Sequence, residues 1–215
     1  MALGRSGRDV ELALPAGGRP LEAAAYHALP AARHGRAVLV IGESDAVDDF
    51  TRDACDRLAR AGFVALAPGL AGATDADALL GACLRFLLDH AASDGGRVGV
   101  MGFGAGGARA LALAEREDRV GCAVDFYGVP DRAAGPATTA AARRELPVLL
   151  VFGNEDEQVR DGSARECAER LPGSRLRTLA GAGAGFMNEA RADRYAAAAA
   201  AAGWDAAIAH LDASL

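Results

Sequence analysis

The fold is decided at residues 97–112, which read RVGVMGFGAGGARALA. An apolar strand is followed by a glycine-dense turn and then by a stretch with the alanine and leucine content of a helix. Strand, tight turn and helix in this order are the layout of a nucleophile elbow, in which a strained turn exposes a nucleophilic side chain. The central position of this turn is Gly104, which has no side chain and cannot act as a nucleophile.

The chain on either side of this turn alternates between short apolar runs and helical patterns. Pro15-Ala-Gly-Gly separates the first two runs and predicts an N-terminal hairpin. Because strands then alternate with helices, we predict a single α/β domain over residues 1–215, with a mostly parallel sheet flanked by helices on both faces. The predicted strands are 10–14, 21–26, 37–41, 63–67, 98–101, 120–126, 148–152 and 175–179, and the predicted helices are 49–61, 75–92, 105–114, 157–171 and 191–215.

Composition excludes several classes of partner. The net charge of −6 argues against nucleic acid or an anionic membrane as a partner. No apolar run reaches the about 18 residues of a transmembrane helix, and the first residues lack the apolar core of a signal peptide. We therefore expect a cytoplasmic protein with reduced, buried cysteines, since no C-x-x-C spacing occurs among Cys55, Cys83, Cys122 and Cys167.

A dinucleotide-binding motif competes with the elbow interpretation. Gly102, Gly104 and Gly107 satisfy G-x-G-x-x-G, and Asp125 follows where a ribose-binding acid would lie. That fingerprint normally follows the first strand of its domain, whereas several strands and helices precede it in this chain. Dinucleotide binding is therefore the weaker interpretation, and we predict no cofactor.

Three aspartates, Asp45, Asp48 and Asp49, resemble a metal-binding cluster. No histidine or cysteine joins them, and they come directly before a predicted helix. We therefore interpret them as acidic groups that complement the positive end of the helix dipole, and we predict no metal site.

Several segments, in unbroken order from about residue 10 to residue 215, resemble the dienelactone hydrolase family of α/β-hydrolases. The matching motifs are Glu43 after a strand, the elbow itself, Phe126-Tyr127-Gly128 at a strand end, the loop 153–159 with Asp156, and the loop 181–189. The resemblance implies an α/β-hydrolase fold whose triad joins a thiol nucleophile, a histidine and an aspartate.

This chain departs from the family pattern at two of the three triad positions. By the resemblance, Gly104 stands at the nucleophile, Ala184 stands at the histidine, and only Asp156 remains. The segment near residues 69–74 is also shorter than in the family, where it carries a helix and an arginine that clamps a substrate carboxylate. The chain therefore resembles a degenerate member, and triad hydrolysis is not expected.

The oxyanion hole survives such losses because it consists of backbone N–H groups. By resemblance these are the amides of Ala105 and Ser44. Such donors also stabilise an enolate, so a nearby carboxylate can move a proton next to a carbonyl group. Glu43 is the first candidate for this base and Asp156 the second, although an aspartate after a strand also commonly caps a helix.

The remaining candidate residues concern substrate binding. Phe103 and Phe186 flank the two altered positions and are expected to form apolar walls, and Tyr127 lines the site or packs beneath the next loop. Glycine and alanine at positions 104 and 184 widen the site, which favours a bulky apolar small molecule. No oligomeric state is indicated by the sequence.

We interpret these features as a non-hydrolytic enzyme, an isomerase, epimerase, cyclase or eliminating lyase, acting on a carbonyl-containing small molecule in bacterial specialised metabolism. The first alternative is a non-catalytic protein that binds a ligand or a partner. The second is residual hydrolysis through an unusual nucleophile, either Ser44 or Glu43.

Overall fold

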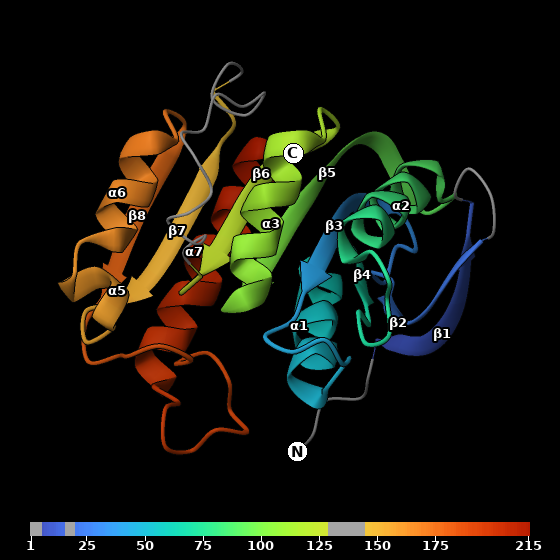
Figure 1. Ribbon diagram of the computed structural model, residues 1–215. Helices are drawn as coiled ribbons and strands as arrows, with labels where there is room; N and C mark the ends of the chain where they lie inside the picture. Colours follow the sequence, from blue (N-terminus) through green and yellow to red (C-terminus); the bar gives the residue numbers. More distant parts are fainter. Residues whose placement is uncertain (1–5, 16–19, 129–144) are drawn as a thin grey trace. The chain divides into compact units, whose positions relative to one another are not determined.

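The computed structural model describes residues 6–15, 20–128 and 145–215. The chain divides into two compact units, Met1–Val98 and Gly99–Leu215, and each is described by itself (Figure 1). Within the described residues, no helix is both long and apolar enough to cross a membrane.

The first unit contains four strands in the order β1-β2-β4-β3, namely β1 (Gly7–Leu14), β2 (Leu21–Ala28), β3 (Gly35–Ile41) and β4 (Val64–Pro68). The predicted hairpin is confirmed, because β1 and β2 pair antiparallel from Gly7 opposite Ala28 to Leu14 opposite Leu21. Strands β3 and β4 pair in parallel, as their continuous apolar runs predict. Residues 69–75 form turns and contain no helix, consistent with the short segment predicted there.

Two neighbouring residues of β2 show that helices cover both faces of this sheet. The Tyr26 hydroxyl donates to Asp56 Oδ1 on helix α1 (Asp49–Arg60) at 3.0 Å. The His27 ring meets Phe86 on helix α2 (Ala76–Asp89), with ring centroids 6.2 Å apart. Because successive side chains of a strand point to opposite faces, α1 and α2 lie on opposite faces of β2.

The second unit begins inside β5 (Ser93–Phe103) and continues with α3 (Ala105–Arg116), β6 (Val120–Phe126), β7 (Val148–Gly153), α5 (Glu157–Arg160), α6 (Ser163–Arg170), β8 (Ser174–Leu179) and α7 (Ala197–Ser214). Strands β6, β7 and β8 are neighbours and pair in parallel. Strand β2 also pairs antiparallel with β4, whereas the pairs β3–β4, β6–β7 and β7–β8 are parallel, so the predicted α/β class with a mostly parallel sheet is confirmed.

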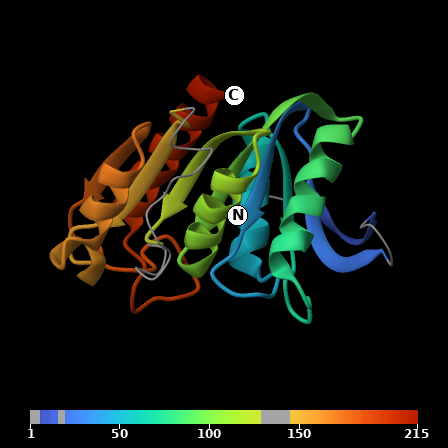
Figure 2. The same cartoon turned by 45° about the horizontal axis from the view of Figure 1, so that its top comes forward.

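Strand β6 is also covered on both faces (Figure 2). The carboxyl group of Asp125 lies so close to Gly107 of α3 that a Cβ atom at residue 107 would collide with it. The next side chain, Phe126, meets Trp204 of α7 with ring centroids 6.1 Å apart. Helices α3 and α7 therefore lie on opposite faces of this strand.

Two predicted helices differ from the observed ones. The helix predicted over 157–171 is split into α5 and α6, because Gly162 takes the left-handed conformation at φ 86° and Asp161 Oδ1 accepts the Ser163 amide at 2.9 Å. The helix predicted from Arg191 begins only at Ala197. The residues before it form turns that start at Asn188, whose Oδ1 accepts the Ala190 amide at 3.0 Å.

Candidate active site

The turn between β5 and α3 has the backbone of an elbow but carries no side chain at its centre. Gly104 has φ 53° and ψ −122°, which lies in a region that residues with a Cβ atom rarely adopt. Its amide donates to the Phe126 carbonyl of β6 at 2.8 Å, and its carbonyl accepts the Gly107 amide at 2.9 Å. Backbone hydrogen bonds therefore hold Gly104 between strand β6 and helix α3.

Backbone hydrogen bonds join the loop after β7 to the end of β8 and to the loop after β8. The Asn154 amide donates to the Leu179 carbonyl at 2.8 Å, and the Glu155 amide donates to the Ala182 carbonyl at 2.9 Å. The Tyr127 amide, just beyond β6, donates to the Val151 carbonyl of β7 at 3.0 Å. These loops all follow the carboxyl ends of parallel strands, where α/β proteins place their ligand sites.

Asp156 lies in the loop after β7, and only one of its two carboxylate oxygens accepts a hydrogen bond from a described residue. Its Oδ1 accepts the Gln158 amide at 2.9 Å and caps α5, as an aspartate in this position often does. Its Oδ2 is buried and has no hydrogen-bond partner in the part of the chain that the structure describes. Burial raises the pKa of this carboxyl, and the Gln158 amide partly opposes the shift.

Ala184 and Ala105 are both exposed, in contrast to the buried Asp156. Ala184 belongs to the loop after β8 that is hydrogen-bonded to the loop of Asp156. Ala105 is the first residue of α3, and its amide has no acceptor among the described residues. An N–H group at this place is available to a developing oxyanion, as the elbow pattern requires.

The three aromatic residues predicted to bind substrate are all buried. Tyr127 has a positive φ of 48°, and its ring meets Phe186 edge-on with centroids 5.3 Å apart. Phe103 is stacked on Phe126 at 5.0 Å and also meets Trp204, which places it in the core beneath α7. Packing therefore accounts for the position of each ring, and their role in binding stays a prediction.

Asp125 is a second carboxyl group at this edge of the sheet, and sequence reasoning did not include it in the site. Its side chain is fully buried, its Oδ1 accepts the Gly128 amide at 3.0 Å, and its Oδ2 has no described partner. Burial raises its pKa well above the ordinary value; the Gly128 amide opposes this, and the charge of Asp156 adds to it. The Asp125 carboxyl packs against Gly107 of α3, and the dinucleotide interpretation stays the weaker one.

A signal for Asp125 was present in the sequence. It is the one acidic residue within the apolar strand VGCAVDF, residues 120–126. Charged residues seldom lie inside such a run unless a specific interaction or a shifted pKa compensates for burial.

Glu43 and Ser44 belong to the first unit, just past the end of β3. Glu43 is half-buried, and Ser44 is exposed with its hydroxyl donating to the Ala46 carbonyl at 3.2 Å. Their parts in catalysis rest on the resemblance and stay predictions.

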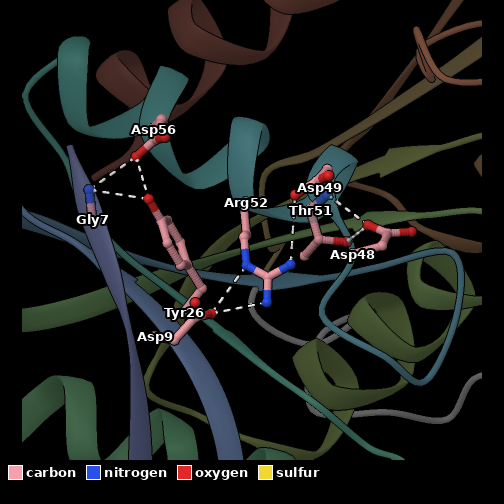
Figure 3. Close-up of polar contacts among 8 residues, drawn as sticks. All are labelled: Gly7, Asp9, Tyr26, Asp48, Asp49, Thr51, Arg52 and Asp56. Carbon is pink, nitrogen blue, oxygen red and sulfur yellow. Dashed lines mark hydrogen bonds and ion pairs between the residues drawn. The ribbon is translucent and has the colours of Figure 1, made fainter. Parts of the chain in front are cut away.

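Asp48 caps a helix, and the backbone of Asp45 stabilises a turn. Asp48 Oδ1 accepts both the amide and the hydroxyl of Thr51, at 2.8 Å and 2.7 Å, and caps α1 (Figure 3). The Asp45 carbonyl accepts the Leu70 amide at 2.7 Å. No group of three or more metal-ligating side chains gathers in the described ranges.

The fold and the elbow define an α/β-hydrolase scaffold, and comparison with known proteins narrows it further. The model of the dienelactone hydrolase family matches residues 23–76 and 72–215, so the chain belongs to the dienelactone hydrolase family. A probable 2-oxo-3-(5-oxofuran-2-ylidene)propanoate lactonase of Bradyrhizobium is 29% identical over 206 residues, covering 81% of this chain and 82% of that protein. Protein usf of Aquifex pyrophilus is 27% identical over 184 residues, covering 74% and 78%.

Solved structures support the same fold. A putative dienelactone hydrolase from Klebsiella pneumoniae has a TM-score of 0.76 at 24% identity and covers 96% of this chain and 98% of its own. A dienelactone hydrolase-like promiscuous phosphotriesterase from metagenomic libraries has a TM-score of 0.82 at 20% identity, covering 97% and 99%. At these identities the likeness establishes the fold alone.

Proposed function

We propose that this family member moves a proton next to a carbonyl group, as an isomerase, epimerase, cyclase or eliminating lyase, instead of performing triad hydrolysis. The observation that carries the proposal is the pairing of an intact elbow backbone at Gly104 with a buried, uncommitted Oδ2 on Asp156. Triad hydrolysis needs a nucleophile and a base to deprotonate it. Glycine and alanine supply neither.

In the proposed reaction, the Asp156 carboxylate takes a proton from the carbon next to the carbonyl group. The electron pair of that C–H bond moves onto the carbonyl oxygen, and the resulting enolate accepts a hydrogen bond from the Ala105 amide. In an isomerase or epimerase the same proton then returns to another carbon or to the other face. In a lyase the enolate instead expels the group on the β carbon, which leaves with that proton, and in a cyclase the enolate carbon adds to an electrophilic carbon of the same molecule, whose oxygen takes the proton. None of these steps consumes water or a cofactor. A raised pKa suits Asp156 to this exchange because a base works best near the operating pH.

The substrate class that we propose is an unsaturated lactone or ester with an apolar body. The lactonase name of one relative supports a lactone, and the loss of two polar side chains at positions 104 and 184 supports the apolar body. By resemblance alone, the Ser44 amide stays a proposed oxyanion donor and the Glu43 carboxylate a proposed base. We further propose a cytoplasmic role in bacterial specialised metabolism.

α-Angelica lactone tests the proposal directly. Removing its α proton and returning it at the γ carbon gives the β isomer, whereas hydrolysis gives an open-chain keto acid. We expect proton NMR in heavy water to show the β isomer forming faster than without enzyme, with no keto acid. Asp156→Asn should slow this at least about 100-fold, and Asp205→Asn, an exposed change on α7, should have no effect.

Two other results of this experiment would contradict the proposal and support a different function. Keto acid formation dependent on Asp156 would identify a hydrolase in which the aspartate activates water, as the hydrolase names of relatives suggest. Binding of the lactone without conversion would instead support a ligand-binding protein that has lost catalysis, which the absence of nucleophile and histidine also favours.

A further inference from the structure

A second concave site lies in the first unit, at the end of its sheet where β3 and β4 begin. The pocket has a volume of about 900 Å³ and lies between the end of β2, the turn after it and the C-terminal ends of α1 and α2. Glu43, the first candidate base of the sequence analysis, lies past the opposite end of β3 and does not line this pocket. Its volume is in the range of pockets that hold small organic ligands.

Three arginines line this pocket, and their guanidinium groups make no hydrogen bond or ion pair with a described residue. They are Arg8 on β1, Arg33 in the turn after β2 and Arg60 at the end of α1. Arg52 behaves differently, because its Nε donates to Asp9 at 3.0 Å (Figure 3). No acidic side chain is present among the described lining residues, although the whole chain carries 29 acidic residues against 23 basic ones.

Two histidines add further polar groups to the same wall. His27 is 8% exposed, and its buried Nε2 has no partner among the described residues. The His90 ring lies edge-on to it at a centroid distance of 4.7 Å. His90 Nδ1 accepts the Ala92 amide at 3.1 Å, so a neutral His90 ring carries its proton on Nε2 and presents a donor.

Burial and positive groups dominate the electrostatics of His27. Burial, the His90 ring and the Arg8 charge together lower the pKa of His27 to about 4, so the ring is neutral at physiological pH. A bound anion would reverse part of this effect, because negative charge beside an imidazole favours the protonated form.

Helix ends alone do not explain this set of cations. A helix C-terminus attracts one positive group, which accounts for Arg60 beside α1. Arg8 comes from a strand and Arg33 from a turn, so both are additional. Arg33 also has a positive φ of 55°, with its amide donating to the Pro30 carbonyl at 2.7 Å, where glycine would fit without strain.

We propose that this pocket binds a small organic phosphate. The phosphate oxygens would be held by Arg8, Arg33 and Arg60, whose planar forks match phosphate geometry and pair with it through charge-assisted hydrogen bonds. The carbon body of the ligand would lie against the apolar turn Leu29–Ala32 and Ala59, which also line the pocket. The ligand therefore combines a doubly charged head with a ring or chain.

Calorimetric titration with adenosine monophosphate, inorganic phosphate and citrate tests this proposal. We expect adenosine monophosphate to bind at a single site and more tightly than inorganic phosphate, because only the nucleotide contacts the apolar turn. Arg8→Gln, Arg33→Gln and Arg60→Gln should each weaken its binding about tenfold. Arg85→Gln, which changes an exposed arginine of α2 outside the pocket, should not change it.

NMR of the wild-type protein provides a test that does not depend on whether the variants fold. The ring signals of His27 should shift when adenosine monophosphate is added at neutral pH. Absence of binding, an equal loss with Arg85→Gln, or an unchanged His27 signal in the saturated complex would overturn the proposal. Citrate binding as tightly as the nucleotide would also overturn it, because the pocket would then recognise charge without preference for phosphate.

Discussion

Asp125 and Asp156 follow one another at the ends of the neighbouring strands β6 and β7, and each keeps one buried carboxylate oxygen without a hydrogen-bond partner among the described residues. Asp125 is the deeper of the two and fully buried, and the charge of Asp156 adds to the upward shift of its pKa. Two buried carboxyl oxygens without a hydrogen-bond partner among the described residues therefore belong to the same unit as an elbow that has no nucleophile. Buried polar groups without a partner are rare in native proteins, and a catalytic role is one of their established explanations.

Because the pKa of Asp125 is raised, we predict that the stability of Asp125→Asn relative to the wild type increases as the pH rises. The folded state holds this proton more tightly than the unfolded chain, so wild-type stability is lost from about pH 4 upward, by at most about 1.4 kcal/mol per pH unit. Asparagine has a similar shape and does not ionise. Urea unfolding at several pH values should show the variant gaining on the wild type with increasing pH.

Asp205→Asn serves as the control for this measurement, because Asp205 is exposed on α7. Its difference from the wild type should stay nearly constant over the same pH range. A constant difference for Asp125→Asn as well would show that Asp125 ionises normally in the folded chain.

Gly104→Ala is expected to lower the free energy of unfolding by about 1–3 kcal/mol. Residues with a Cβ atom are strained at φ 53° and ψ −122°, so the loss arises from the backbone conformation at the turn. Gly183→Ala is a matched change, since a Cβ atom there meets nothing within 4 Å. Chemical unfolding should place the control within about 0.5 kcal/mol of the wild type; equal stability of both variants would refute strain at residue 104.

The sequence predicted strands better than it predicted helix ends or buried polar groups. Strand β6 has the predicted bounds, because a continuous apolar run leaves few alternatives. The last helix was predicted six residues too early, at Arg191, because alanine propensity carries no information about the turns that Asn188 starts. Likewise, the order of motifs located the loop of Asp156, but the uncommitted Oδ2 depends on tertiary packing that no local pattern encodes.

Restoring two side chains should convert the site to hydrolysis. The double variant Gly104→Cys with Ala184→His places a thiol on the elbow and an imidazole in the loop fastened to that of Asp156. Nucleophile and base act as a unit, so p-nitrophenyl acetate cleavage should rise at least about 100-fold in the double variant and little in either single variant. Adding Asp156→Asn should remove most of the gain, and a folded double variant without activity would show that the elbow no longer faces that loop productively.

His27 predicts a loss of stability in acid, opposite in sign to the effect of Asp125. Burial, His90 and Arg8 lower the pKa of His27 from 6.5 to about 4 in the folded chain, so the unfolded chain binds its proton first. Stability is therefore complete above about pH 6.5 and falls towards pH 4, by up to about 3 kcal/mol. In urea unfolding at several pH values, His27→Gln should reduce the change of the free energy of unfolding with pH in this range. His34→Gln, a change at an exposed histidine paired with Asp94, should leave that pH dependence unchanged. If both variants keep the wild-type slope, another group accounts for the acid sensitivity.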